Sequence, residues 1–324
     1  MLEKELLFVV SELADTRLQD IARTLRWSAQ RVHYAIKALE KKGVLGSAFS
    51  VIDYSYFGQL LFRVYCRGAY IREKDRDQLL VYLQKHACVV ALYEMDGEYD
   101  LVIEMCAPNP SHFYKELRDI IEKYPSLQRH DIVLNIVTYL YPRSYLVKKE
   151  YAQLPSHIII GGDRTLYTLS KQEILFLQHL VKDPLANIRS LTKRTSMHSV
   201  TIHKMRKELQ EQKILRATKY IVHHQSIGLL SYRIFLQLHN LTNEKEQELR
   251  DFLLHTKEVV RMHKTIGSWH MEIDIESFDR NRIRHFSIHL REDFKDIIAS
   301  YNSIEWHAFY KRTYLPQYLF DVDT

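Results

Sequence analysis

The sequence has few cysteines and few glycines. Its three cysteines, Cys66, Cys88 and Cys106, are odd in number and widely spaced, which argues against a disulfide framework and against a zinc ribbon. Each lies in or next to an apolar, strand-like segment, so we expect reduced thiols that fill the core of an intracellular, cytoplasmic protein. Nine glycines in 324 residues provide no glycine-rich loop that could cradle a phosphate.

Long apolar runs are also missing. None approaches the ~20 residues of a membrane-spanning helix, and the charged N-terminus, residues 3–5, continues into a helical pattern rather than into a signal peptide. We therefore expect no membrane contact. Hydrophobic residues make up 46% of the chain, which is enough for a large core. The formal net charge of +6 is compatible with an anionic partner such as DNA but selects none.

Residues 18–45 have the pattern of two short helices joined by a tight turn. Apolar residues at spacings of three and four mark one face of each helix, and Ser28 is a good N-cap for the second helix. The opposite face of that helix carries polar and basic side chains. A helix-turn-helix that reads the major groove needs this combination, although an ordinary helical hairpin with a solvated basic face has the same pattern.

The chain repeats itself with a shift of 170 residues, which grows to 173 or 174 near the end of each copy. The register holds for about 80 residues without a gap, so the chain consists of two diverged copies of one unit. The aligned pairs include Leu18 and Ile188, Arg63 and Arg233, Gly97 and Gly267, Leu117 and Leu290, and Pro142 and Pro316.

The sequence of each copy predicts two domains, and the expected fold class is α+β. Three helices and an extended region, 45–52 or 215–223, fit a winged helix-turn-helix with a two-stranded wing. The series that follows, βαββαβ, predicts a ferredoxin-like domain. The expected boundaries are 1–53 and 164–224 for the winged helices, 54–147 and 225–324 for the ferredoxin-like domains, and 148–163 for a connector in which 158–160 could add an edge strand.

This domain order resembles the Lrp/AsnC (feast/famine) family of transcription regulators. The resemblance is carried by SAQRVHYAIKALEKKGVL at 28–45 and MDGEYDLVIEM at 95–105. It implies sequence-specific binding of double-stranded DNA, dimerisation through the β-sheets, often further assembly into oligomers, and frequently an amino-acid effector. Because this chain carries two units, the resemblance also implies an intramolecular pseudo-dimer and a DNA site with two dissimilar halves.

The candidate DNA-contacting residues are polar side chains on or next to the second helix of each pair. Residues 1–53 hold 8 Lys/Arg and 7 Asp/Glu, a net charge of +1, whereas residues 163–224 hold 12 and 5, a net charge of +7. Because phosphate neutralisation sets most non-specific affinity, we expect the second copy to supply more of it. The candidates are Ser28, Gln30, Arg31, His33, Tyr34, Lys37 and Lys41 in the first copy, and Lys193, Arg194, His198, Ser199, Thr201, His203, Lys204 and Lys207 in the second.

An effector site like that of the family would lie at Gly97 and Asp100. The alternative is a hairpin turn in which the glycine supplies a positive φ and the aspartate bonds local backbone. His285 and His289 lie one turn apart on a predicted helix, but no motif accompanies them. We therefore expect no metal site and no cofactor.

An enzyme is the alternative function. The unit of a winged helix and a ferredoxin-like domain also resembles siroheme decarboxylases, in which two such units are sometimes fused in tandem. This resemblance implies a cleft with His, Tyr and Arg side chains near the second strand of the ferredoxin-like domain and its hairpin. No Ser/His/Asp set or paired-carboxylate motif is present, so we expect a regulator and not an enzyme. The region that corresponds to the decarboxylase cleft contains Tyr93, Glu94, Asp96 and Tyr99 in the first copy, which do not match, and His263, Lys264, Trp269 and His270 in the second, which match in part.

Overall fold

The computed structural model describes residues 4–14, 16–70, 72–147 and 157–321, and its elements follow each other in the same order in both copies. The first copy contains α1 (Lys4–Glu12), α2 (Leu18–Leu25), α3 (Ala29–Lys41), β1 (Leu45–Ile52), η1 (Tyr54–Phe57), β2 (Leu60–Cys66), α4 (Glu73–Lys85), β3 (Val89–Asp96), β4 (Leu101–Ala107), α5 (Pro110–Lys123), η2 (Pro125–Gln128), β5 (His130–Leu140) and η3 (Ser144–Leu146).

The second copy follows an edge strand, β6 (Ile158–Gly161). It contains α6 (Lys171–Lys182), α7 (Ile188–Thr195), α8 (Ser199–Glu211), β7 (Leu215–Val222), η4 (His224–Ile227), β8 (Leu230–Leu238), α9 (Asn243–His255), β9 (Val259–Gly267), β10 (Met271–Ser277), α10 (Arg280–Asp293), β11 (Ile298–Arg312) and η5 (Gln317–Phe320). The predicted α+β class with tandem units is confirmed.

Both predicted helix-turn-helix pairs are present, as α2–α3 and α7–α8. The turn of each pair begins with a residue in the left-handed region, Arg26 at φ 55° and Ser196 at φ 57°, and these positions align in the repeat. Ser28 accepts a hydrogen bond from the backbone N–H of Arg31 at 3.1 Å, as expected of an N-cap. In the second copy Ser170 and Glu173 form a capping box at the start of α6.

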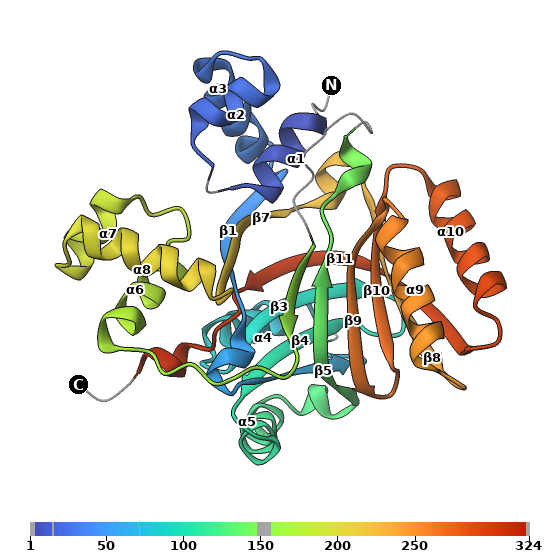
Figure 1. Ribbon diagram of the computed structural model, residues 1–324. Helices are drawn as coiled ribbons and strands as arrows, with labels where there is room; N and C mark the ends of the chain where they lie inside the picture. The colour runs from blue at the N-terminus through green and yellow to red at the C-terminus, as the bar shows by residue number, and fades with distance from the viewer. Residues whose placement is uncertain (1–3, 15, 71, 148–156, 322–324) are drawn as a thin grey trace.

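The prediction of a two-stranded wing within each copy is wrong. Each copy supplies a single strand, and β1 pairs with β7 in antiparallel register, with Leu45 opposite Val222 and Ile52 opposite Leu215. A periodic pattern marks a strand but not its partner, and here the partner lies in the other copy. The two helix pairs therefore enter this shared ribbon from opposite ends (Figure 1).

The two ferredoxin-like domains pair with each other within the chain. The sheet order is β2-β4-β3-β11-β8-β10-β9-β5-β6, and β2 also pairs with β5, so eight strands close into a barrel. Two strands join the copies. The strand β5 pairs with β2 of its own copy on one side and with β9 of the second copy on the other. The strand β11 pairs with β8 of its own copy on one side and with β3 of the first copy on the other. The predicted strand at 158–160 is β6, which pairs with residues 137–140 of β5.

Helices cover the outside of the barrel, α4 and α5 over the first copy and α9 and α10 over the second (Figure 1). Apolar residues of α4 and α5, such as Leu83 and Leu117, are buried against β2, β3 and β4. The N-cap of α5 is Asn109, whose side chain accepts from the N–H of His112 at 2.8 Å. Among the described helices, none is long and apolar enough to cross a bilayer.

Candidate functional site

The interior of the barrel holds a network of buried charges centred on two aligned arginines, Arg63 and Arg233. Arg63 donates to Glu104 at 3.0 Å and to Glu272 at 2.9 Å. Arg233 forms a two-pronged pair with Asp274, at 2.6 and 2.9 Å. Both arginines are at most 1% exposed. Their donors are directed at protein acceptors, so this network is suited to holding the two copies in register rather than to binding a ligand.

His263 belongs to this network and is held neutral. Its Nδ1 lies 2.9 Å from Nη2 of Arg63, which can only donate, so Nδ1 must accept. Burial and the nearby charge of Arg63 lower the pKa of His263 from 6.5 to about 4. Burial alone would raise the pKa of Glu104 and of Asp274, but Arg63 and Arg233 respectively hold these pKa values low.

The lowered pKa of His263 predicts a loss of stability in mild acid. Between about pH 6.5 and pH 4, His263 is protonated in the unfolded chain but stays neutral in the folded chain. The free energy of unfolding therefore decreases as the pH falls through this window, by up to about 3 kcal/mol. The variant His263→Gln should show a flatter slope there in denaturation measured at several pH values. Parallel slopes for the two proteins between pH 6.5 and 4 would rule out this role of His263.

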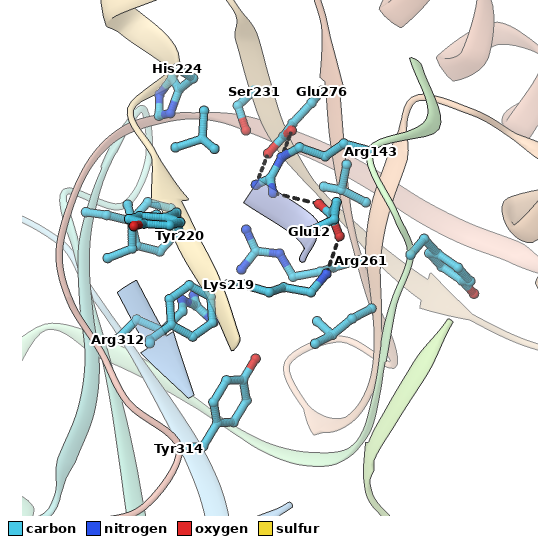
Figure 2. Close-up of a pocket in the computed structure, with 17 residues that line it drawn as sticks. Glu12, Arg143, Lys219, Tyr220, His224, Ser231, Arg261, Glu276, Arg312 and Tyr314 are labelled. Carbon is cyan, nitrogen blue, oxygen red and sulfur yellow. Dashed lines mark hydrogen bonds and ion pairs between the residues drawn. The ribbon is translucent and has the colours of Figure 1, made fainter. Parts of the chain in front are cut away.

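The basic cavity lies at the junction of the barrel, the β1–β7 ribbon and α1. Its empty volume, which includes open solvent at its mouth, is about 610 Å³. Its polar and charged lining consists of Glu12 from α1, Arg143 after β5, Lys219 and Tyr220 from β7, His224 from η4, Ser231 from β8, Arg261 from β9, Glu276 from β10, Arg312 from β11 and Tyr314 after it (Figure 2).

Four cations and two carboxylates line this basic cavity. Arg143 donates to Glu276 at 2.8 Å and to Glu12 at 3.0 Å, and Lys219 also pairs with Glu12. Burial alone would raise the pKa of Glu276, but Arg143 lowers it, so the carboxylate stays ionised. Both carboxylates of the lining are therefore already paired with protein cations, and the lining as a whole carries an excess of positive charge.

Arg312 is the cation of this lining that forms no ion pair in the part of the chain that the structure describes. Within the described residues no carboxylate lies within ion-pair distance of it, and its Nη2 is buried with no hydrogen-bond partner. The guanidinium lies over the rings of Phe309 and Phe49, at 5.0 and 6.0 Å. Burial lowers the pKa of Arg261. The carboxylate of Asp274, at 3.0 Å, acts to raise this pKa, whereas the like charge of Arg312 lowers it further. An anionic ligand would relieve this excess of charge.

Two side chains in the basic cavity are suited to proton transfer. Nε2 of His224 lies 2.7 Å from the backbone carbonyl oxygen of Trp306. Because a carbonyl only accepts, Nε2 carries the proton and Nδ1 is left with its lone pair. The hydroxyl of Tyr314 points into the cavity (Figure 2). The cavity therefore combines cations that can hold carboxylates with groups that can exchange a proton.

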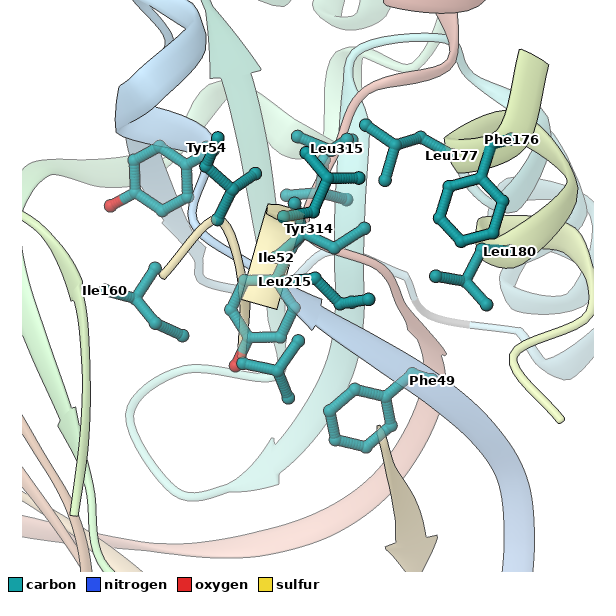
Figure 3. Packing of buried hydrophobic residues seen from close by; sticks show 14 of the residues in the cluster. Phe49, Ile52, Tyr54, Ile160, Phe176, Leu177, Leu180, Leu215, Tyr314 and Leu315 are labelled. Atoms are coloured by element: carbon teal, nitrogen blue, oxygen red, sulfur yellow. The ribbon is translucent and has the colours of Figure 1, made fainter. Parts of the chain in front are cut away.

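The position related to the basic cavity by the repeat is filled. There, Tyr54, Leu61 and Cys106 take the places of His224, Ser231 and Glu276, and all three are buried in an apolar cluster. Figure 3 shows this cluster, in which Phe176, Leu177 and Leu180 of α6 face Phe49, Ile52 and Leu215 of the ribbon. The two copies therefore provide one basic cavity and one closed core.

The predicted DNA-contacting residues lie on the outside of the helix pairs, away from the basic cavity. All are exposed except Thr201, which is half-buried. Arg31 lies over the ring of Trp27 at 3.7 Å. Part of the charge counted in the second copy is paired: Arg194 contacts Asp183 at 2.8 Å, and Lys204 and Lys207 lie 3.7 Å from Glu208 and Glu211 respectively.

Gly97 and Asp100 have identifiable local contacts. Asp100 accepts from the backbone N–H of Gly68 and, at 3.3 Å, from that of Ala69. Gly97 does not have a positive φ; a Cβ there would come within 3.0 Å of Ile304 on β11, so glycine permits the close approach of the other copy. A separate hollow beside the hairpins is lined by Arg67, Glu98, Tyr99, Asp131, Phe235, Gln237, Ser268, Trp269, Ser300 and Asn302.

The residues considered for a decarboxylase cleft do not line the basic cavity. Tyr93 and His263 belong to the barrel network, and Trp269 donates to Glu272 at 2.8 Å. The basic cavity contacts the start of β9, whereas His263 and Trp269 lie further along the β9–β10 hairpin. A sequence signal for the cavity exists: aligned positions change from apolar to polar between the copies, as from Leu61 to Ser231 and from Ala91 to Arg261.

Two solved structures match almost the whole chain. The siroheme decarboxylase NirDL in complex with an iron-uroporphyrin III analogue has a TM-score of 0.58 and 12% identity, covering 97% of this chain and 93% of that one. A second structure of NirDL has a TM-score of 0.57 and 12% identity, covering 98% and 97%. AsnC of E. coli, with a TM-score of 0.36 and 17% identity, covers 43% of this chain and 92% of its own.

At these identities the likeness is one of fold. No family model matches the sequence, and no curated protein matches it. The expectation that the chain is not an enzyme is corrected by the NirDL structures, because the fold that matches over the full length is that of an enzyme.

Proposed function

We propose that this protein binds a polycarboxylated tetrapyrrole of the siroheme class in the basic cavity and decarboxylates its side chains. The observation that carries the proposal is the half-buried Arg312, which forms no ion pair within the described residues, has a buried Nη2 without a hydrogen-bond partner, and lies among three further cations. A ligand with several carboxylates matches such a lining, since each can take a charge-assisted hydrogen bond. The full-length likeness in fold to NirDL supports this choice of ligand.

The reaction needs a proton donor and no oxidant. The bond between a carboxymethyl carbon and its carboxylate breaks, CO2 leaves, and the electron pair that stays on the carbon takes a proton to give a methyl group. Arg312, Lys219 and Arg143 hold and orient the carboxylates. His224 and the hydroxyl of Tyr314 are the groups in the cavity that can pass a proton to this carbon.

The test is incubation of the purified protein with siroheme, with the absorbance of the tetrapyrrole reporting binding and mass spectrometry of the extract reporting loss of CO2. We expect both signals. Binding without loss of CO2 would support the ligand and refute the reaction. No absorbance change at micromolar siroheme would refute the proposal as a whole.

DNA binding is a second candidate function, favoured by the exposed polar faces of α3 and α8. We expect charge reversal of Lys204 and Lys207 to weaken binding to duplex DNA more than reversal of Lys37 and Lys41, because the second helix pair has the larger net charge. Gel retardation across a salt series would measure this. The opposite ranking would refute it, and selection of two identical half-sites from a random pool would argue against unequal reading helices.

A further inference from the structure

A cluster of metal-ligating side chains lies outside the basic cavity, on the outer face of the first ferredoxin-like domain. His86 ends α4, Cys88 precedes β3, and Glu116 lies on α5. Their ligand atoms all lie within 4.8 Å of one another, and in the part of the chain that the structure describes this is the one such group of three. Two separate segments, the connection between α4 and β3 and the helix α5, thus bring different ligand types to one point.

His112 lies beside this cluster as a candidate fourth ligand. It lies one turn before Glu116 on α5, and its Nε2 is 3.8 Å from Sγ of Cys88 and 3.9 Å from a carboxylate oxygen of Glu116. Nε2 of His86 is 3.7 Å from the other oxygen of Glu116. One nitrogen that faces both a sulfur and a carboxylate at this distance is typical of ligands that converge on a shared centre.

These separations are close to those of a tetrahedral zinc site. Zinc bonds of about 2.0–2.3 Å place neighbouring ligand atoms about 3.3–3.6 Å apart, and the three contacts of 3.7, 3.8 and 3.9 Å are only slightly longer than this. We propose that His86, Cys88, His112 and Glu116 bind a Zn²⁺ ion. The thiolate and the carboxylate balance the charge of the ion, and the mixed sulfur, nitrogen and oxygen set suits a borderline metal.

Binding has two visible local costs. The ammonium of Lys311 lies close enough to act towards a lower pKa of both His86 and Cys88, so its charge opposes a bound cation. The backbone N–H of Cys88 lies 3.3 Å from Nδ1 of His86. If Nε2 of His86 binds the ion, the ring proton moves to Nδ1 and this long contact is lost. In return, the ion links the end of α4 and the start of β3 to α5, so the metal-bound chain should resist unfolding more strongly.

The second copy provides an internal comparison. The positions that align with the cluster are Thr256, Glu258, His285 and His289. They include no thiol, and Glu258 is engaged by Arg282 at 2.8 Å. We therefore expect one zinc ion per chain, and His285→Ala is a matched control that removes a histidine at the aligned position of the other copy.

The experiment uses the full chain, stripped of metal and titrated with Zn²⁺ against a chromophoric chelator. We expect one tight equivalent per chain and a rise in melting temperature. With Co²⁺ in place of Zn²⁺ we expect the charge-transfer absorption of a cobalt–thiolate bond. Cys88→Ser should abolish this absorption and weaken Zn²⁺ binding at least ~10-fold, whereas His285→Ala should change neither.

A folding defect of Cys88→Ser is separated from loss of a ligand by Glu116→Gln, which alters a partly exposed side chain and leaves the thiol in place. Glu116→Gln should also weaken Zn²⁺ binding at least ~10-fold. Absence of the cobalt–thiolate absorption in the unaltered chain would overturn the proposal. Zn²⁺ affinity that is unchanged in both variants would overturn it equally.

Discussion

Replacing Arg233 by methionine is expected to lower the free energy of unfolding by about 3–5 kcal/mol. The guanidinium is fully buried and makes two hydrogen bonds to Asp274, at 2.6 and 2.9 Å. It also donates to the hydroxyls of Tyr65 and Tyr93, at 2.8 and 2.7 Å. Methionine fills much of the volume but leaves a buried carboxylate without this partner, and such a charge is costly to bury.

Arg233→Lys should fall between the wild type and Arg233→Met. Lysine keeps the charge but cannot form the planar fork that meets both oxygens of Asp274. The control is Arg282→Met, which breaks an ion pair between an exposed arginine and Glu258 and should cost no more than about 1 kcal/mol. A loss for Arg233→Met as small as that of the control would show that the network does not stabilise the fold.

The measurement should report the unfolding of the barrel alone, because a chain with several domains need not unfold in one step. Trp269 and Trp306 are buried in the barrel, whereas Trp27 packs with the first helix pair. Fluorescence-detected denaturation in a Trp27→Phe background therefore reports the barrel. The three arginine variants should be compared in that background.

The elements of the fold could be predicted from the sequence because their signals are local. Apolar spacing marks each helix, and an internal repeat shows that each element occurs twice. Pairing between strands is not local: β1 and β7 are equivalent strands of the two copies, one repeat apart in the sequence, and nothing in residues 45–52 specifies Leu215–Val222 as the partner. Closure of the barrel by β3–β11 and β5–β9 follows from the same long-range pairing.

The basic cavity was not predicted for a related reason. Glu12, Arg143, Lys219, Arg261 and Arg312 come from five distant segments, and no spacing connects them. The aligned arginines Arg63 and Arg233 are visible in the repeat, but a sequence cannot tell a buried structural guanidinium from one that binds a ligand. The difference lies in their contacts: Arg63 and Arg233 form ion pairs with carboxylates, whereas Arg312 forms none within the described residues and only its more distant charge helps to lower the pKa of Glu104.

That difference leads to the second large effect. Arg312→Met is expected to weaken siroheme binding by about 10- to 100-fold, which corresponds to about 1.4–2.7 kcal/mol. It should leave the free energy of unfolding within about 1 kcal/mol of the wild type. Methionine keeps the packing over Phe49 and Phe309 and removes both an unsatisfied buried nitrogen, itself worth about 1–3 kcal/mol, and a like charge beside Arg261.

Arg143→Ala should behave differently, because Arg143 is paired with two buried acids, Glu12 and Glu276. We expect it to lose both ligand binding and about 3–5 kcal/mol of stability. Equilibrium titration with siroheme and denaturation of the same samples separate the two outcomes. Wild-type affinity in Arg312→Met would refute the proposed role of that guanidinium.

Stoichiometry provides an independent check on the same site. Because Tyr54, Leu61 and Cys106 fill the aligned position in the first copy, the titration should saturate at one tetrapyrrole per chain although the fold is duplicated. Two equivalents of equal affinity would require the closed core to open, at the cost of exposing its buried apolar side chains. A single equivalent that is weakened in Arg312→Met would locate the bound ligand in the basic cavity.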